Sequence, residues 1–496
     1  MNSSLVSSSQ MRAMEEKAFA RGIEAEALMD QAGAGIAAAV QQFFLDPGYC
    51  IVYSGKGNNG GDALVAAAHL QRAGWSVDVR LAFPENESGE LMRKKLKGLR
   101  ELESGTGLKA ATATIILDGL LALGAKPPLR EPVRSACREI NRLRRKQGMF
   151  VFAVDLPTGL DGDSGETDPD CVMADCTISI AFAKKGLVAD GATNHVGRLE
   201  IVPLADLSWD GETSAEPVPT SPGIVATAHS LRGLLPPRDF DVHKNQFGRI
   251  GIVAGSKGFT GAALMCSLGA LRGGAGLVEV FVPEEIYPIV AAAAPPEAMV
   301  KSITGSLLDQ PLDVWAVGPG LGKDRTAEVL ELIERAEKPM VVDADGLNIL
   351  AVKPETLLQC AGPRLLTPHP GEMKRLFPAV EKSRAETVEK FCDKYPVTLL
   401  LKGSRTIVGE RKRPHSFNTT GNPGMATGGM GDVLTGVCAA LIGQKLTPYD
   451  AARLGAWLCG RAAELAIFAG CASEESLLPR DVLDQLGAAF SDLREA

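Results

Sequence analysis

A glycine-rich turn that ends in an aspartate lies near the C-terminal end of the chain, at Gly428-Gly-Met-Gly-Asp432. Its glycines leave backbone N–H groups uncovered, and the apolar run 433–442 predicts a helix whose positive dipole end points at the same place. Such a turn can hold the charge that builds up on a phosphoryl group during transfer. Asp432 could take a proton from a substrate hydroxyl. A plain loop with an aspartate helix cap explains these residues about equally well.

A second glycine-rich turn, Ser54-Gly-Lys-Gly-Asn-Asn-Gly-Gly-Asp62, follows a predicted strand and opens a predicted helix. It is neither a Walker A loop nor a dinucleotide-binding fingerprint, but it can cradle a phosphate or pyrophosphate. Asp155 follows another predicted strand and is a candidate for proton transfer. Asp118 ends a third strand. Lys185 is a weaker candidate, which an ordinary surface lysine would also explain.

Two blocks of alternating strand and helix patterns must position these turns. In the first block, strands are predicted at 50–53, 77–82, 114–118, 150–155 and 176–182, and helices at 11–18, 24–40, 63–73 and 132–146. In the second block, strands are predicted at 250–254, 276–282, 314–318, 340–343, 364–367 and 398–402, and helices at 262–273, 325–336, 370–377, 385–395 and from 433 onward. This alternation predicts parallel sheets covered on both faces, with ligands bound at the carboxyl ends of the strands.

Polar or glycine-rich turns follow most predicted strands of the second block. They lie at 254–256, 318–322, 343–348, 367–372 and 402–406. Each turn alone is ordinary loop chemistry. Because five of them should meet at the strand ends that also receive Gly428–Asp432, the sequence predicts a ligand site there.

The composition indicates a globular protein of two or three domains, with 496 residues, 45% hydrophobic and 23% charged. A net charge of −8 argues against nucleic acid as a partner. We see no secretory signal or membrane span, and the ten cysteines lack metal-binding spacing, so we expect a cytoplasmic protein. The basic runs 142–146 and 411–413 are interpreted as a solvated helix face and a hairpin tip.

The segment from 208 to about 231 is rich in proline, serine and acidic residues and has no apolar periodicity. It is the best linker candidate. We therefore expect one domain at 1–210, a linker at 211–231 and a second domain at 232–496.

The motifs of the second block together resemble the NAD(P)H-hydrate dehydratase family, whose fold is ribokinase-like. The resemblance covers about residues 235 to 490 and rests on 243–248, 261–262, 318–320, 367–371, 402–403 and 422–432. It implies removal of water from nicotinamide cofactors hydrated across a ring double bond, driven by a nucleoside phosphate. Asp432 would be the base on the hydroxyl at carbon 6 as that oxygen attacks the terminal phosphoryl group. The ring nitrogen lone pair would then expel phosphate.

The same resemblance implies which residues bind the reactants. Those expected to contact the hydrate are Ala262, Gly320, His369 and Asp432, and those expected to hold the adenine nucleotide are Lys402, Gly403, Ser404, Arg405, Thr406 and Gly431. His369 could instead be a helix-entry residue, but its strand-end place favours binding by roughly three to one. The nucleotide is ADP or ATP, and ADP is preferred because the fused chain resembles bacterial members. Magnesium is expected without assignable ligands.

The first block, about residues 10 to 210, resembles the NAD(P)H-hydrate epimerase family through 11–15, 28–33 and the turns above. The implied potassium ligands, which can all offer oxygen to a hard cation, are Asn59, Asp118 and Thr158. The implied hydrate contacts are Asn58, Asn59, Gly60, Gly61, Asp62, Ala122, Leu123, Gly124, Ala125, Lys126, Pro127, Pro128 and Asp155. Asp155 is the candidate acid/base that interconverts the two configurations at carbon 6.

Two departures from the epimerase pattern put that activity in doubt. The turn Ala122-Leu-Gly-Ala125 replaces a Gly-Thr-Gly-Leu-like sequence, and Ala63 replaces a common glycine. Loss of a hydroxyl and a glycine in a ligand loop weakens binding.

We therefore expect an α/β protein with an N-terminal Rossmann-like three-layer αβα sandwich and a C-terminal ribokinase-like αβα domain. It would repair NADHX and NADPHX by epimerisation and ADP-dependent dehydration, use K⁺ in the first domain and Mg²⁺ in the second, and form a homo-oligomer. The alternative is a ribokinase-like kinase for a vitamin-precursor alcohol whose first block is a non-catalytic binding module. The retained residues 58–59, Asp118 and Asp155 are evidence against a non-catalytic module. The altered turn at 122–125 is evidence for it.

Overall fold

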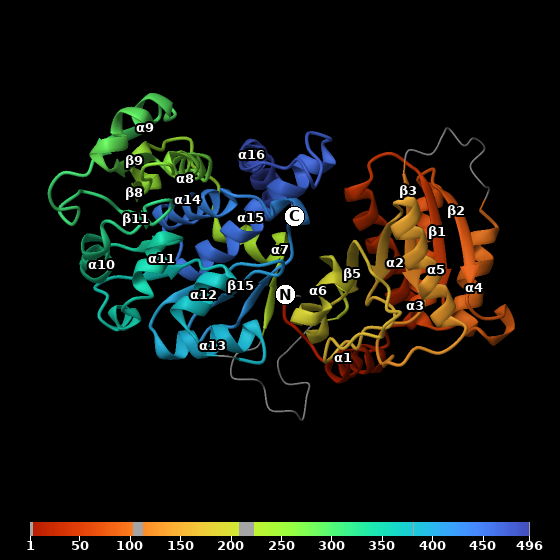
Figure 1. The fold of residues 1–496 in the computed structure, drawn as a ribbon. Helices are drawn as coiled ribbons and strands as arrows, with labels where there is room; N and C mark the ends of the chain where they lie inside the picture. Colours follow the sequence, from red (N-terminus) through yellow and green to blue (C-terminus); the bar gives the residue numbers. More distant parts are fainter. Residues whose placement is uncertain (1–2, 103–112, 208–222, 380, 496) are drawn as a thin grey trace. The chain divides into compact units, whose positions relative to one another are not determined.

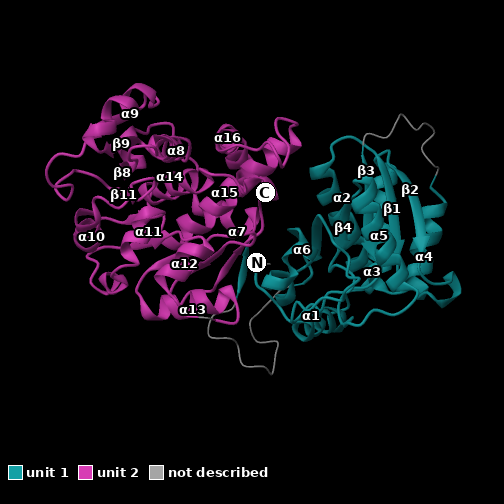
Figure 2. Cartoon of the chain, in the orientation of Figure 1, with its two compact units in different colours: residues 1–225 teal, residues 226–496 magenta. Residues whose placement is uncertain are grey.

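The computed structural model describes residues 3–102, 113–207, 223–379 and 381–495. The chain forms two compact units, Met1–Val225 and Ala226–Ala496 (Figures 1 and 2). Each unit has its own sheet and its own hydrophobic core. The predicted division into two α/β domains is confirmed, although the boundary between the units falls at a single point inside the proposed linker.

Unit 1 is built on a six-stranded sheet with the strand order β2-β1-β3-β4-β5-β6. All of its pairings are parallel. Its strands are β1 (Tyr49–Ser54), β2 (Ser76–Leu81), β3 (Thr114–Gly119), β4 (Phe150–Val154), β5 (Cys176–Ile180) and β6 (Arg198–Val202). Its helices are α1 (Ser8–Ala20), α2 (Ala25–Phe43), α3 (Asn58–Arg72), α4 (Glu90–Arg100), α5 (Val133–Gln147) and α6 (Thr193–Val196).

Helices cover both faces of this sheet. Apolar side chains of α2, α3 and α4 pack with alternate strand residues in one cluster, and those of α5 pack with the other strand residues in a second cluster. The central strands are apolar on both faces, as is typical of a buried parallel sheet. The three-layer αβα arrangement predicted for this unit is therefore confirmed.

Unit 2 is built on a ten-stranded sheet with the order β10-β9-β8-β11-β12-β13-β14-β15-β16-β7. Its strands are β7 (Ile224–Ala226), β8 (Arg249–Val253), β9 (Leu277–Val282), β10 (Ala298–Ser302), β11 (Val314–Val317), β12 (Met340–Val342), β13 (Arg364–Leu366), β14 (Thr398–Leu401), β15 (Ile407–Gly409) and β16 (Ser416–Asn418). The strands from β10 to β14 are parallel, whereas β14–β15 and β15–β16 are antiparallel. The predicted parallel sheet is extended at this end by the antiparallel strands β15 and β16, because short turns at 402–406 and 410–415 return the chain directly.

The helices of unit 2 are α7 (Ala228–Leu231), α8 (Thr260–Arg272), α9 (Tyr287–Ala293), α10 (Thr326–Arg335), α11 (Asp345–Leu350), α12 (Pro370–Leu376), α13 (Arg384–Lys394), α14 (Met430–Gly443), α15 (Pro448–Phe468) and α16 (Pro479–Glu495). The main core joins α8, α14, α15 and α16 to one face of the sheet. α14 lies very close to α8, since a Cβ at Gly436 would stand 2.1 Å from the carbonyl oxygen of Cys266. This contact fixes the N-terminal end of α14.

Part of the proposed linker has regular structure. Residues 208–222 lie outside the described residues, but Ile224–Ala226 form β7 and Ala228–Leu231 form α7. Val225 and Leu231 are fully buried. These elements could not be predicted, because three or four residues are too short to show a periodicity.

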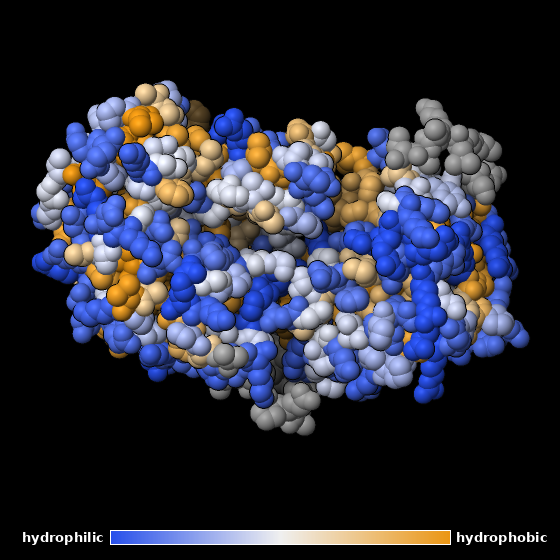
Figure 3. Space-filling model, in the orientation of Figure 1, coloured by the Kyte–Doolittle hydropathy of each residue, from blue (hydrophilic) through white to orange (hydrophobic). Residues whose placement is uncertain are grey.

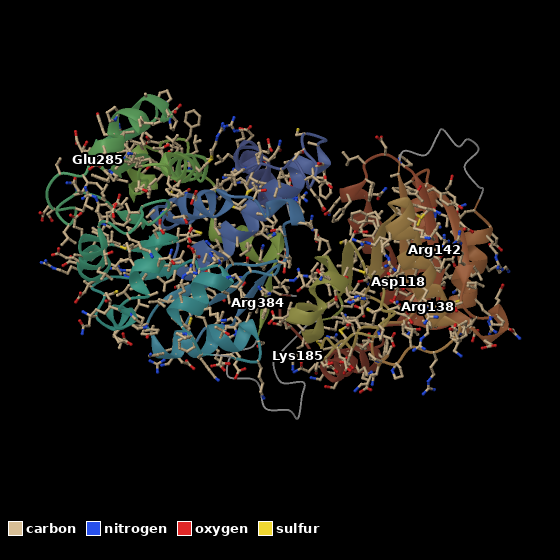
Figure 4. The ribbon with its side chains drawn as sticks, viewed as in Figure 1. Asp118, Arg138, Arg142, Lys185, Glu285 and Arg384 are labelled. Atoms are coloured by element: carbon tan, nitrogen blue, oxygen red, sulfur yellow. The ribbon has the colours of Figure 1, made fainter. Side chains whose placement is uncertain are left out.

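The basic run at 142–146 lies on the solvent side of α5, as predicted, and Figure 3 shows a hydrophilic surface over this helix. Figure 4 labels Arg138 and Arg142 there, and Arg138 donates to Asp170 at 2.8 Å. The run at 411–413 lies in the turn between β15 and β16, which is the predicted hairpin tip. No helix within the described residues is long and apolar enough to span a membrane.

Candidate active sites

In unit 2 the predicted turns meet at the carboxyl ends of β8, β11, β13 and β14. The Gly255 amide donates to the Pro319 carbonyl at 2.8 Å, and Ser256 Oγ donates to the Gly320 carbonyl at 2.8 Å. The Lys402 amide donates to the Pro368 carbonyl at 2.8 Å. These cross-links bring turns from distant parts of the chain into one site, as the strand-end argument predicts.

The N-terminal end of α14 supplies the glycine turn. The helix begins at Met430 rather than at Val433, so Gly431 and Asp432 belong to its first turn. Gly429 caps it with φ of 93°, a left-handed conformation that favours glycine. The first N–H groups of a helix have no intrahelical acceptor and carry its positive partial charge. The turn is therefore a suitable place for an anionic phosphoryl group.

A buried network of charges lies beside this turn. Lys402 Nζ lies 2.7 Å from Asp343 Oδ1 and 3.9 Å from Glu372 Oε2. Asp343 Oδ2 accepts a hydrogen bond of 2.8 Å from Thr435 Oγ on α14. The sequence analysis noted Asp343 only as part of a polar turn and assigned it no role.

The carboxyl group of Asp432 is poised to titrate near neutral pH. Burial and the negative charge of Asp343, partly opposed by Lys402, together raise the pKa of Asp432 to about 7. A carboxylate with such a pKa is a stronger base than an exposed one.

The other residues predicted to bind the hydrate lie at this edge of the sheet. A Cβ at Gly320 would stand 2.8 Å from Cβ of Ala262, so these two positions are in contact. His369 is the N-cap of α12, where its Nδ1 accepts from the Gly371 amide at 3.0 Å. The helix-entry role that the sequence analysis left open is thus present, although about half of this side chain remains exposed.

The turn at 402–406, predicted to hold the nucleotide, joins β14 to β15. Its first residue, Lys402, directs its ammonium group into the network with Asp343, and Arg405 is buried. Arg384, which Figure 4 labels, is the first residue of α13. A Cβ added at Gly403 would meet its guanidinium group. Arg384 is therefore a cation beside this turn that the sequence analysis did not identify.

Gly431 allows the close approach of α14 to Lys402. A Cβ there would lie 3.2 Å from Lys402 Nζ and 3.4 Å from Asp343 Oδ2, whereas nothing lies within 4 Å of a Cβ at Gly428. We expect Gly431→Ala to lower the rate of the reaction at this site by roughly tenfold, because it displaces an anchored lysine. Gly487→Ala on α16, where nothing lies within 4 Å of an added Cβ either, is the control outside the site and should keep nearly full activity. Equal effects of the two substitutions in steady-state assays would contradict the close-approach argument.

In unit 1 the glycine turn at 58–62 is the first turn of α3, which begins earlier than predicted. The side chain of Asn59 is buried, and neither its Oδ1 nor its Nδ2 has a hydrogen-bond partner in the structure. An unpartnered buried amide is costly unless a ligand or ion satisfies it. The replacement of a glycine by Ala63 is accommodated, because its methyl group lies against Gly119, where a Cβ would stand only 2.4 Å away.

Asp118, at the end of β3, and Thr158 lie together. Thr158 donates to Asp118 through its Oγ at 2.7 Å and its amide at 2.9 Å. Burial raises the pKa of Asp118 to about 6, against the lowering effect of these hydrogen bonds. The Cα of Gly119 faces the backbone of Asn59, since a Cβ there would lie 3.1 Å from the Asn59 carbonyl oxygen. The three predicted potassium ligands thus come from neighbouring strand ends.

Asp155 follows β4 and adopts φ of 66°, which is unusual for a residue other than glycine. Its Oδ1 accepts from the Ile180 amide at 3.0 Å and from the ammonium group of Lys184. Lys184 is 1% exposed and also donates to the Ile180 carbonyl at 3.0 Å. A strained backbone at a buried ion pair is a common feature of functional sites.

Lys184 is a candidate that sequence reasoning missed in favour of its neighbour. Lys185 starts a short 3₁₀ helix on the segment after β5 and is only half-buried. Figure 4 labels this residue. The two lysines are adjacent and equivalent in type, so only the burial of one of them separates their roles.

Two further carboxyl groups lie near this pair. Burial raises the pKa of Asp62 well above its usual range, and the negative charges of Asp155 and Glu15 add to that effect. Burial likewise raises the pKa of Glu15, partly opposed by Lys184. Unit 1 therefore gathers three carboxyl groups and a lysine at one place, and such groups can move protons.

The altered turn at 122–125 keeps a regular geometry. The Ala125 amide donates to the Ala122 carbonyl at 3.1 Å, and Gly124 has φ of 88°. The preceding Leu121 amide donates to Thr158 Oγ at 3.1 Å, which ties the turn to the predicted potassium ligands. Arg12 of α1 lies directly against Gly124.

Comparisons with known proteins match both units. Residues 250–484 match the family described as NAD(P)H-hydrate dehydratase, and residues 25–186 match the family described as YjeF-related protein N-terminus. The chain is 36% identical to a bifunctional NAD(P)H-hydrate repair enzyme from Moorella thermoacetica, over 94% of this chain and 93% of that protein. It is 34% identical to a protein of the same description from Escherichia coli, over 92% of this chain and 88% of that protein.

A solved structure of an ADP/ATP-dependent NAD(P)H-hydrate dehydratase from Bacillus subtilis, co-crystallised with ATP and Mg²⁺, also matches. It is 28% identical, covers 54% of this chain and 98% of its own, and has a TM-score of 0.49.

Proposed function

The chain belongs to the bifunctional NAD(P)H-hydrate repair enzymes, and from this we propose which reaction each of its two sites carries out. It repairs hydrated nicotinamide cofactors, with a dehydratase in unit 2 and an epimerase in unit 1. The alternative of an alcohol kinase with a non-catalytic first block is not supported, since relatives that match over both units are named repair enzymes.

In unit 2, Asp432 takes the proton of the hydroxyl at carbon 6 while that oxygen attacks the terminal phosphoryl group of the nucleotide. The amides of the first turn of α14 hold the phosphoryl group. The nucleotide leaves with one phosphate fewer, and the ester phosphate then departs from carbon 6 with the help of the ring nitrogen lone pair. Loss of a proton from carbon 5 restores the double bond. The observation that carries this assignment is the place of Asp432 on the helix turn that Lys402 and Asp343 flank.

The nucleotide of unit 2 is proposed to be ADP, with ATP as a second substrate, and to lie along the turn 402–406. Arg384 is close enough to that turn to pair with a phosphate. Magnesium would supply charge neutralisation for the phosphates. Within the described residues, no group of three or more His, Cys, Asp or Glu could hold a metal ion.

In unit 1, Asp155 is proposed as the acid/base that interconverts the two configurations at carbon 6. That carbon carries both the hydroxyl and the ring nitrogen, so a proton given to the hydroxyl lets it leave as water while the nitrogen lone pair forms a C=N bond; water then adds to the opposite face and the proton returns to the acid/base. Lys184 forms an ion pair with Asp155 and holds its carboxyl group in place. Hydrate contacts are proposed from the turns 58–62 and 122–128.

A potassium site in unit 1 is proposed at Asn59, Asp118 and Thr158, because the Asn59 amide has no partner there. We expect epimerisation to be faster in KCl than in an equal concentration of tetramethylammonium chloride, and Asn59→Ala to remove most of that difference. The rate of epimer exchange, followed by chromatography, checks this. Activation by K⁺ that persists in Asn59→Ala would contradict the site.

The pH dependence of dehydration should report Asp432. The base must be ionised, so kcat/KM should be low at acid pH and rise through a midpoint near pH 7, in accord with the pKa of about 7. The measurement is the initial rate with the isolated S epimer and ADP across roughly pH 5 to 9. A rate already at its plateau at the acid end would show that Asp432 is not the limiting base.

The direct test of the proposed reaction is to supply the purified protein with the S form of hydrated NADH and either ADP or ATP. We expect reduced nicotinamide absorbance to return, with one inorganic phosphate released per cofactor and AMP formed from ADP. A stable phosphate ester accumulating from a vitamin-precursor alcohol, with no recovery of the cofactor, would instead favour the kinase alternative.

We further propose that the protein acts in the cytoplasm and forms a homo-oligomer. None of the ten cysteines forms a disulfide, and most are buried apolar side chains, which suits a reducing compartment.

A further inference from the structure

Asp343 occupies the centre of the unit 2 site, although the proposed mechanism gives it no task. It directly follows β12 and is 1% exposed. Its backbone is fixed on both sides, because its amide donates to the Val317 carbonyl at 3.0 Å and its carbonyl accepts from the Gly346 amide at 2.9 Å. A carboxylate so deeply buried must be paired to be tolerated.

The two oxygens of Asp343 bind two different elements. Oδ1 lies 2.7 Å from Lys402 Nζ, which follows β14, and Oδ2 accepts from Thr435 Oγ on α14 at 2.8 Å. Thr435 lies three residues after Asp432, so both residues share one side of the helix. The carboxylate thus joins the strand-end lysine to the helix that carries the proposed base.

The same carboxylate lies next to the backbone of the glycine turn. A Cβ at Gly431 would stand 3.4 Å from Asp343 Oδ2 and 3.2 Å from Lys402 Nζ. One negative and one positive charge therefore flank the residue that immediately precedes Asp432.

We propose that Asp343 is a positioning residue for dehydration, which anchors Lys402 and α14 to each other and places a fixed negative charge beside Asp432. The inference rests on the proposed function of unit 2. It assigns two separable effects to one side chain, a structural one through Thr435 and Lys402 and an electrostatic one on the base.

The other charges around Asp432 act on the same equilibrium and must be counted. Lys402 opposes Asp343, while Asp345 at the start of α11 acts in the same direction as Asp343. Glu372 on α12 lies 3.9 Å from Lys402 and weakens its effect. The thiol of Cys266 on α8 also faces Asp432, but burial raises its pKa so far that it stays neutral. The balance between Asp343 and Lys402 therefore dominates.

This balance predicts opposite responses to two substitutions. Asp343→Asn keeps the shape and the hydrogen bond from Thr435 but removes the negative charge, so Asp432 should ionise at a pH lower by roughly one unit. Lys402→Met removes the positive charge and leaves Asp343 unopposed, so Asp432 should ionise at a higher pH. Damage to the fold alone would not move the two variants in opposite directions.

The experiment follows the carboxyl-carbon NMR signal of Asp432 with pH in protein labelled at aspartate, with the signal assigned by its loss in Asp432→Asn. The acid limb of kcat for the S hydrate and ADP is measured in parallel. Shifts of opposite sign in the two variants support the proposal. Shifts of the same sign, or no shift in a folded Asp343→Asn protein, overturn it.

Thr435→Val provides a third variant in case Asp343→Asn does not fold. It keeps both charges and removes only the hydrogen bond to α14, so kcat should fall while the NMR titration of Asp432 does not move to lower pH. A kcat equal to that of the wild type would refute the anchoring role. Because the NMR titration needs no substrate, it tests the inference even if the hydrate is not the substrate, and absence of wild-type turnover would refute the proposed function separately.

Discussion

Replacing Asp432 with asparagine is expected to lower kcat for ADP-dependent dehydration by about 10²–10⁴-fold, the contribution of a well-placed general base. The amide has the same shape but cannot accept the hydroxyl proton as the oxygen attacks the phosphoryl group. Binding of ADP should change little, because the helix amides and the 402–406 turn remain. Steady-state rates with the S hydrate, together with calorimetric titration of ADP, separate the two effects.

The fold should survive this change. Burial raises the pKa of Asp432 to about 7, so at higher pH the folded protein bears the cost of an ionised buried carboxylate. This group favours the folded state most at acid pH and loses that contribution as the pH rises through its folded pKa. We therefore expect Asp432→Asn to unfold at an equal or higher temperature than the wild type above pH 7. The exposed Asp324→Asn is the control, and retained kcat in Asp432→Asn would remove this residue from the mechanism.

The second large effect is expected from Lys184→Met in unit 1. The methionine fills a similar volume but leaves the Asp155 carboxylate buried without its cation. Removing one partner of a buried ion pair costs on the order of 3–5 kcal/mol. The carboxyl group of Asp155 would also lose the contact that holds it in place, so epimerisation should fall by about 100-fold or more.

Lys185→Met is the matched control for this prediction, because Lys185 is the adjacent residue and is only half-buried. It should leave both stability and epimerisation nearly unchanged. Dehydration of the S epimer, which needs only unit 2, should persist in both variants. Thermal unfolding and epimer exchange measure the two expectations, and equal loss in both lysine variants would show that burial of Lys184 does not distinguish it.

The place of the sites could be predicted from sequence because it follows from chain topology. Alternating strands and helices determine that Asp343, Lys402 and the turn 318–322 meet at one edge of a sheet, whatever the details of packing. The same reasoning placed Asp118 and Asp155 at strand ends of unit 1. Both units show this arrangement.

The starts of α3 and α14 could not be predicted, since glycine is a poor helix former. Both helices begin inside their glycine turns, at Asn58 and Met430. Close packing against neighbouring backbone favours small residues there and outweighs the intrinsic propensity. Asp432 consequently lies in the first helical turn instead of before it.

The side-chain pairings within the two sites could not be predicted from the sequence either. Asp343 meets Lys402 across 59 residues and Thr435 across 92, and no local pattern records such contacts. Whether Lys184 or Lys185 enters the core depends on the path of the chain after β5, which local sequence does not specify. The cap formed by His369 was foreseen only as an alternative.

The central claim is that one chain returns both hydrate epimers to the reduced cofactor. The most direct measurement supplies an equilibrated mixture of R and S hydrated NADH with excess ADP and follows the absorbance of reduced nicotinamide to its end point, faster than the epimers interconvert without enzyme. The account predicts full recovery by the wild type, recovery of the S fraction alone by Lys184→Met, and none by Asp432→Asn. Wild-type recovery that stops at the S fraction would contradict the epimerase in unit 1, and no recovery would contradict the whole assignment.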